Sequence, residues 1–400
     1  MSRVSDYPIN IKNKIGTDDS IKKVYSLLIV VYPILNRYAS FLPMLTLSET
    51  FLLFFLIYVV IKKKIHFQTV YLPFVLYLIF LVFHYISQNT NGEAASDNIG
   101  TMLRLIYLYS SIILVGRGFL DGQKAVKWLN IAAILMVCYC ILQTLAAKFG
   151  IYLTTYIPGL PIMAEDRDEF ILMQQQKYGL TYRAYGLLNE PSLLCVYLIL
   201  PLAINLFSNL NIKSRIKKAA FISLGCFICM SSTGIIVCSA VWMMYIFINK
   251  SREAKRYRKY VIWMVLIAII VIPNTILWET FMERTFGGSI SEASLEHTTR
   301  FNALDMLNII FNNSTDFLIG VGMETTVFYL PGFLRVFYTM GMIGLIIVFF
   351  MFINIYRKGD PCQKKLMFIY IILNIGTEIL LGNFAIYYLA FINAEKKEIY

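Results

Sequence analysis

The sequence predicts an all-α, polytopic integral membrane protein whose residues 1–400 form a single transmembrane domain. Of the 400 residues, 58% are hydrophobic and only 15% are charged, and the mean hydropathy is +0.64. An ordinary water-soluble domain does not have this composition. Apolar runs of roughly 17–25 residues, long enough to cross a bilayer about 30 Å thick, recur from Val24 to the C-terminus. Lys and Arg gather in every second connection between these runs.

The apolar runs predict about 12 transmembrane helices. Two neighbouring runs are short for a span, but the basic loops that flank this pair favour two crossings. The expected helices cover residues 24–45, 47–61, 69–87, 99–116, 125–147, 189–210, 217–231, 234–249, 260–278, 334–356, 365–381 and 383–394.

The distribution of positive charge predicts the orientation of these helices. Alternate connections and the two ends of the chain hold 27 of the 36 Lys and Arg residues. Because positive charge marks cytoplasmic loops, we expect both termini in the cytoplasm. The net charge of +12 follows from this topology, so a nucleic-acid partner is not needed to explain it. The basic segments are 1–23, 62–64, 117–127, 213–218, 250–259, 357–365 and 396–397.

Five arginines fall on the opposite, external side of the expected topology. The first helix is expected to carry Arg37 about 20 Å along its axis, and Arg104 is expected about 7 Å below the outer end of the fourth helix. An arginine inside the bilayer usually pairs with another group or serves a pathway. Snorkelling side chains and internal ion pairs are the structural alternatives. The five are Arg37, Arg104, Arg183, Arg300 and Arg335.

Arginine clusters of this kind suit a phosphate ligand. The planar guanidinium binds phosphate through two hydrogen bonds and keeps its charge when it is desolvated. The sequence therefore predicts that a lipid phosphate or pyrophosphate binds on the external side of the protein, which itself lies in a lipid bilayer.

Two long external loops, 148–189 and 279–332, are expected to complete the site. Loops of this length in a compact protein are usually functional or disordered. The second loop contains an amphipathic stretch, 300–311, whose apolar residues recur at helical spacing, so we expect a helix on the membrane surface. Arg300 would lie in its first turn, where the helix dipole disfavours a cation, which suggests an anionic partner.

The first loop ends in the strings RAYG (183–186) and NEPS (189–192), which run directly into an apolar helix. Asn189 is the expected N-cap and Pro191 fits the first helical turn. Glu190 would then lie near a helix N-terminus beside Arg183. It is a candidate general base, or a carboxylate that favours the dipole or pairs with Arg183.

Together with these strings, GVGME (320–324), YTMGMIG (338–344) and the SSTG hairpin (231–234) resemble bacterial O-antigen polymerases, within the superfamily that also holds O-antigen ligases. The resemblance covers roughly residues 180–356. Ligases of this superfamily typically carry a histidine in the second long loop or beside the last external helix. The one external histidine, His297, lacks the sequence context expected of that histidine, whereas Arg335 stands nearer the expected place, which favours a polymerase.

The resemblance implies inverting glycosyl transfer at the periplasmic face of the bacterial inner membrane. A growing glycan on undecaprenyl pyrophosphate moves onto an incoming lipid-linked repeat unit, without metal or cofactor. A chain-length regulator and a flippase would be partner proteins. The expected catalytic residues are Arg183, Glu190, Arg300 and Arg335, and the expected substrate-binding residues are Arg37, Arg104, Tyr185, Asp305 and Glu324.

Four other interpretations remain open. A ligase of the same superfamily is one. A flippase is another, but it needs polar groups near the bilayer midplane, whereas the candidate charges here are external. Asp166 and Asp168 have the spacing of a divalent-metal motif, and Cys226 and Cys229 have that of a zinc or redox motif. A solvated acidic loop and packed small residues are the simpler interpretations of these two pairs.

Overall fold

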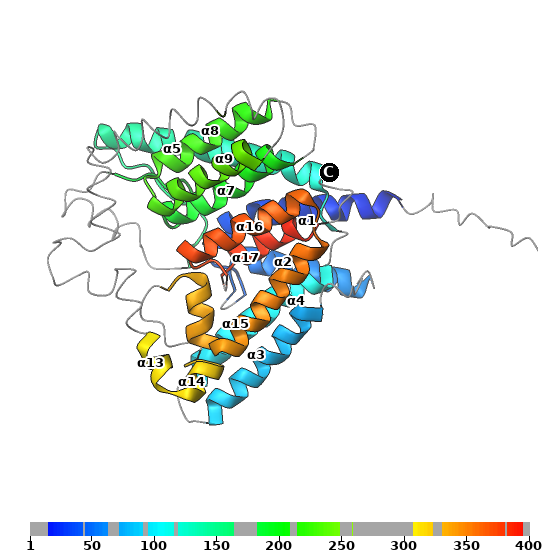
Figure 1. The fold of residues 1–400 in the computed structure, drawn as a ribbon. Coiled ribbons are helices and arrows are strands. Elements are labelled where there is room, and N and C mark those ends of the chain that lie inside the picture. The colour runs from blue at the N-terminus through cyan, green and yellow to red at the C-terminus, as the bar shows by residue number, and fades with distance from the viewer. Residues whose placement is uncertain are drawn as a thin grey trace, which may run out of the picture.

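A computed structural model describes residues 15–42, 45–62, 72–90, 95–115, 119–163, 182–208, 214–248, 258, 307–322, 330–380 and 382–394. Helices make up 78% of this part, and its β pairing consists of the isolated bridges Tyr38–Ile162 and Ala39–Thr46 (Figure 1). The helices are α1 (Ile15–Leu35), α2 (Leu47–Ile61), α3 (Leu72–Thr90), α4 (Ala95–Val115), α5 (Gly122–Lys148), α7 (Pro191–Phe207), α8 (Arg215–Ile228), α9 (Ser232–Ile248), α13 (Leu307–Asn312), α14 (Ser314–Ile319), α15 (Gly332–Lys358), α16 (Pro361–Gly376) and α17 (Phe384–Ile392).

Most of the expected helices form near their predicted positions, and α2 has the predicted bounds. The first helix differs. It ends at Leu35 rather than at residue 45, so the prediction that Arg37 lies on this helix was wrong. Pro33 removes one helical N–H donor from the last turn, and Tyr38 and Ala39 then bridge to other segments. The expected helix 260–278 lies outside the described residues.

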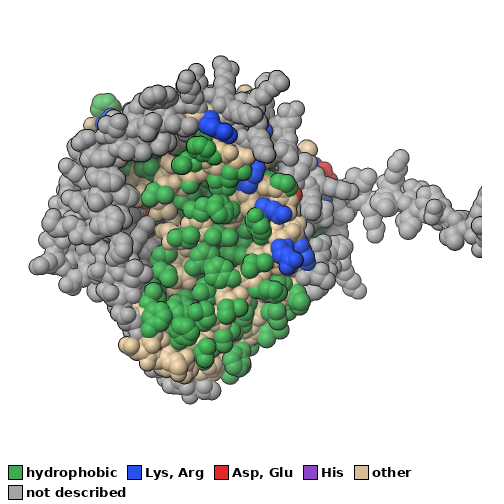
Figure 2. Space-filling model, viewed as in Figure 1, with side chains coloured by type: hydrophobic (Ala, Val, Ile, Leu, Met, Phe, Trp, Pro, Cys, Tyr) green, Lys and Arg blue, Asp and Glu red, His purple; other side chains and the backbone are tan. Residues whose placement is uncertain are grey.

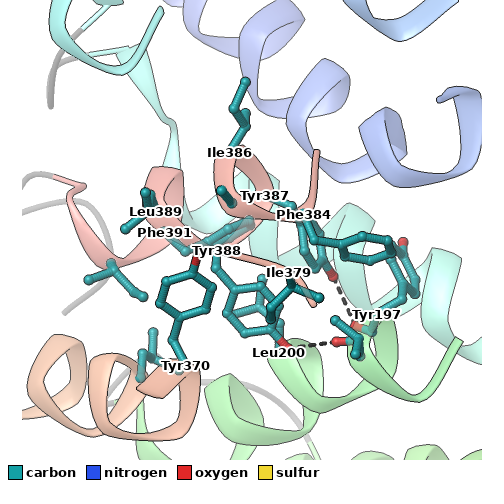
Figure 3. Close-up of a cluster of buried hydrophobic side chains, with 14 of the residues drawn as sticks. Tyr197, Leu200, Tyr370, Ile379, Phe384, Ile386, Tyr387, Tyr388, Leu389 and Phe391 are labelled. Atoms are coloured by element: carbon teal, nitrogen blue, oxygen red, sulfur yellow. Dashed lines mark hydrogen bonds between the residues drawn. The ribbon is translucent and has the colours of Figure 1, made fainter. Parts of the chain in front are cut away.

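Helix α7 lies at the centre of the bundle, with 15 of its 17 residues buried. Its Pro201 has no N–H, so the carbonyl of Tyr197 lacks its helical donor. The Tyr387 hydroxyl of α17 donates to this carbonyl at 3.0 Å, and Tyr388 donates to the Val196 carbonyl at 2.6 Å. Figure 3 shows these tyrosines packed between α7, α16 and α17. Aromatic hydroxyls therefore support a helix that proline weakens.

The outer surface of the bundle is largely apolar. Two described helices, α5 and α15, are long and apolar enough to cross a membrane, and five shorter apolar helices accompany them. Large side chains such as Phe83, Leu135 and Ile346 are more than half exposed. Figure 2 shows this apolar face with a row of Lys and Arg along one edge. Soluble monomers rarely expose so extensive an apolar surface.

Helix α15 is broken at Gly341, where φ is 65° and ψ is −168°. In an unbroken helix the carbonyls of Tyr338 and Thr339 would accept from the two residues after the break. Here Val321 N–H donates to the Tyr338 carbonyl at 2.9 Å, and Gly322 N–H donates to the Thr339 carbonyl at 3.2 Å. The segment after α14 thus fills the break in α15. The sequence pattern predicted neither this break nor α14.

The amphipathic helix expected at 300–311 is described only in its second half. Helix α13 covers Leu307–Asn312, and residues 300–306 lie outside the described part of the chain. Buried Leu307 and Ile310 pack with Leu330, Phe337 and Tyr338 in a small cluster beside α15. This part of the predicted apolar stripe therefore contacts the bundle itself.

Candidate functional site

Six of the nine predicted site residues belong to the described part of the structure. They are Arg37, Arg104, Arg183, Tyr185, Glu190 and Arg335. The other three, Arg300, Asp305 and Glu324, lie outside the described residues.

The loop 182–190 leads into the buried N-terminus of α7. Glu190 is the N-cap and Pro191 occupies the first turn, so the prediction that Asn189 caps this helix was wrong by one residue. The Glu190 side chain does not cap the helix, because its carboxylate instead accepts from the Ser192 hydroxyl at 3.1 Å. Tyr185 is buried, with 1% exposure, so in this structure its ring packs in the core.

Arg183 connects this loop to the turn between α8 and α9. Its Nε donates to the carbonyl of Cys229, the C-cap of α8, at 3.2 Å. The next residue, Met230, has a φ of 48°, which is uncommon for a side chain other than glycine. The SSTG hairpin follows immediately. The RAYG string therefore contacts the turn that directly precedes the SSTG hairpin.

Arg37 contacts the same loop from the end of α1. The guanidinium is 6% exposed and donates from one nitrogen to the Thr155 carbonyl at 2.8 Å, the Thr155 hydroxyl at 3.1 Å and the Leu188 carbonyl at 3.4 Å. These acceptors belong to two different loops. Arg37 thus holds the loop 151–163 against the loop 182–190.

Arg104 forms an ion pair with a residue that the sequence analysis did not select. Its Nε lies 3.0 Å from a carboxylate oxygen of Glu49, whose side chain is fully buried, whereas the Arg104 side chain is 43% exposed. The other Glu49 oxygen accepts from Thr46 N–H at 2.8 Å in a capping box that starts α2. A threonine three residues before a glutamate at the start of an apolar run was the available signal.

Arg335, near the start of α15, forms an ion pair with Glu378 in the turn between α16 and α17. The same turn accepts a backbone hydrogen bond from Gly332 N–H to the Thr377 carbonyl, at 2.9 Å. Gly376 lies against Thr233 of α9, so closely that a Cβ there would lie 3.2 Å from a Thr233 methyl carbon. The first turn of α9 and the end of α16 are therefore neighbours.

Asn36 completes a closed ring of contacts. Its side-chain oxygen accepts from Asn383 at 2.6 Å, Thr46 at 3.1 Å and Ser48 at 3.3 Å. We define the polar ring by four neighbouring segments: the loop 182–190, the turn 229–234, the described residues 376–380 and 382–383, and residues 36–38, which follow α1. Arg183, Thr233, Asn36 and Arg37 make the successive connections.

Gln143 of α5 is a second residue that the sequence analysis missed. It is fully buried, and its side chain bonds to both backbone groups of Gly186 in the RAYG string. No local sequence signal marks Gln143, because its importance comes from a contact with a residue far along the chain.

The cysteines of the Cys226 and Cys229 motif belong to a larger buried group. Cys195 of α7 interacts with both of them, and Cys140 and Cys238 extend the group onto α5 and α9. All seven cysteines are free thiols. Among the described residues, no three His, Cys, Asp or Glu side chains are arranged to hold a metal ion.

Comparison of the chain with models of known protein families finds no match, and no curated protein sequence matches it significantly.

Proposed function

We propose that this chain is a polytopic membrane glycosyltransferase of the O-antigen polymerase kind. It would transfer a growing glycan from undecaprenyl pyrophosphate to an incoming lipid-linked repeat unit, at the periplasmic face of a bacterial inner membrane. Two long apolar helices, the exposed apolar surface and the row of cations along one edge of it support a membrane setting. The distribution of Lys and Arg supports about 12 crossings with both termini in the cytoplasm.

The polar ring carries the proposal. It holds a cation, Arg183, and a carboxylate, Glu190, on one loop at the N-terminus of the largely buried helix α7. In the proposed topology this end of α7 faces the periplasm. Among the strings that resemble O-antigen polymerases, GVG donates to carbonyls of YTMG, and Arg183 of RAYG donates to Cys229, two residues before the SSTG hairpin. These contacts support a functional role for each pair of segments.

In the proposed reaction, the bond between the donor sugar C1 and a pyrophosphate oxygen breaks, and C1 bonds to the acceptor hydroxyl oxygen. The bonding electron pair leaves with the pyrophosphate, where Arg183, Arg300 and Arg335 stabilise the developing negative charge. Glu190 accepts the proton of the acceptor hydroxyl. Because the hydroxyl attacks the face opposite the leaving group, the configuration at C1 inverts.

The other candidates take separate roles in this proposal. Arg104, half exposed beside the buried Glu49, suits contact with a lipid phosphate. Asp305 and Glu324 remain candidates for sugar contacts. Arg37 and Tyr185 are buried, so we assign Arg37 to loop position and Tyr185 to packing. A chain-length regulator and a flippase remain proposed partners.

The test is complementation in a host that lacks its own polymerase but supplies the matching lipid-linked repeat unit. We expect Arg183→Ala to reduce long polysaccharide by at least about 100-fold, because it removes a preorganised charge from the leaving group. Single repeat units should still reach the cell surface. Arg357→Ala changes an exposed arginine in the last turn of α15 and serves as the matched control. Polysaccharide length is read on gels.

The same assay separates the alternatives. Repeat units that accumulate on the cytoplasmic face would favour a flippase and contradict the proposal. Loss of polymer attachment with normal polymer length would favour a ligase. Glu190→Gln should reduce polymer as strongly as Arg183→Ala, and full-length polymer from this variant would remove Glu190 as the base.

A further inference from the structure

The loop that carries Arg183 and Glu190 is fixed by a side chain from α5. The Gln143 oxygen accepts from Gly186 N–H at 2.9 Å, and its nitrogen donates to the Gly186 carbonyl at 3.1 Å. The same nitrogen lies 3.4 Å from the Thr154 carbonyl. One fully buried amide therefore satisfies both backbone groups of a loop residue and reaches a second loop.

Gly186 requires such a partner because of its conformation. Its φ of 63° is in the left-handed region, and a Cβ there would lie 3.0 Å from the Met136 sulfur and 3.6 Å from that of Cys140. Met136, Cys140 and Gln143 recur at helical spacing along one face of α5. Buried backbone polar groups without hydrogen bonds destabilise a fold. The amide of Gln143 therefore supplies the hydrogen bonds that a helix or a sheet would give to these backbone groups.

Arg37 acts on the same pair of loops, one residue further along the first loop and two residues further along the second. It bonds to Thr155 and Leu188, whereas Gln143 bonds to Thr154 and Gly186. The two side chains reach the loops from different places, Gln143 from α5 and Arg37 from the turn that follows α1. The loop 182–190 is thus fixed at two points between Arg183 and Glu190.

We propose that Gln143 is a positioning residue for the reactive loop: its amide, by gripping both backbone groups of Gly186, sets where Arg183 and Glu190 lie relative to the substrate. This inference rests on the proposed function. Gly186 stands three residues after Arg183 and four before Glu190, so a change in its position moves both. Displacements of about 1 Å are enough to reduce a rate about 100-fold.

Two variants and a control test the proposal. Gln143→Leu keeps the size of the side chain but removes all of its hydrogen bonds. Gln143→Glu accepts from Gly186 N–H in either protonation state, but it donates to a carbonyl only when it is neutral. Gln123→Leu changes an exposed glutamine on the same helix and should behave like the unsubstituted protein. Monodisperse elution from size exclusion identifies the folded variants.

The first readout is hydrogen exchange, which does not depend on any activity. In purified protein we expect Gln143→Leu to accelerate exchange at Gly186 at least about tenfold, because this amide loses its acceptor. Exchange at Gly186 that stays at the unsubstituted rate would overturn the proposal. This readout remains valid even if the unsubstituted chain fails to make polysaccharide, which would contradict only the proposed function.

The second readout is polymer length as a function of pH. In Gln143→Glu, residue 143 can donate to the Gly186 carbonyl only while its carboxyl group is protonated. Relative to the unsubstituted chain, the polymer yield of Gln143→Glu should therefore be greatest at low pH and fall as pH rises. The polymer yield of Gln143→Leu should be low at every pH. Faster exchange at Gly186 with full-length polymer in Gln143→Leu would exclude the positioning role.

Discussion

Two places where an irregular segment attaches to the helices, here called joints, are held by different kinds of group. At the first, the loop 182–190 is held by side chains, since Gln143 and Arg37 donate to its backbone carbonyls. At the second, the break in α15 is filled by backbone alone, since Val321 and Gly322 donate to carbonyls that the broken helix leaves available. Both joints hold irregular chain segments in place. In a helix or a sheet, the backbone N–H and C=O groups of such segments would bond to each other.

The difference determines what each joint tolerates. The backbone joint depends on close approach, because a Cβ on Gly341 would lie 2.4 Å from the Leu318 carbonyl, and one on Gly320 would lie 2.4 Å from backbone atoms of Thr339. The side-chain joint depends on several separate hydrogen bonds. We therefore expect the backbone joint to fail as a whole and the side-chain joint to weaken in steps.

The largest effect should come from Gly341→Ala. The change adds a Cβ at a backbone conformation that is almost restricted to glycine and forces two backbones apart, so we expect a loss of about 3 kcal/mol or more in the free energy of unfolding. Thermal unfolding in detergent measures it. Gly100→Ala is the control, because a Cβ there has open space in α4. An unchanged unfolding temperature for Gly341→Ala would show that this joint does not need glycine.

A smaller effect is expected from Arg37→Met at the side-chain joint. The change leaves the buried carbonyls of Thr155 and Leu188 without this donor, which should cost about 2–3 kcal/mol. Exchange should also accelerate in both loops, as measured by mass spectrometry. Arg357→Met, at an exposed position, controls for loss of charge. If the loop 151–163 loosened alone, Arg37 would not join the two loops.

The smallest effect is expected from Thr155→Val. Only the hydroxyl that Arg37 contacts at 3.1 Å is lost, while the carbonyl contact at 2.8 Å remains. We therefore expect the free energy of unfolding to fall by about 1 kcal/mol. Thr154→Val alters a neighbouring exposed side chain and should leave the free energy of unfolding unchanged. A loss for Thr155→Val as large as that for Arg37→Met would contradict a stepwise joint.

Local signals predicted local structure well. Thr46 and Glu49 were present as a capping pair before an apolar run, and the bounds of α2 were predicted correctly. The N-cap of α7 was displaced by one residue because Asn189 and Glu190 both precede Pro191, and local chemistry favours asparagine as a cap. Arg37 was misplaced because its apolar surroundings continue past the end of α1 at Leu35.

The sequence by itself determined the helical composition, the apolar surface and most helix positions, because these follow from the spacing of apolar residues and from the nearest neighbours of each cap. Only the tertiary structure decided which partner each arginine has, that Gln143 grips Gly186 and that the segment after α14 enters the break in α15. These contacts join residues far apart in the chain, and a hydrogen bond between distant segments leaves no periodic pattern in the sequence.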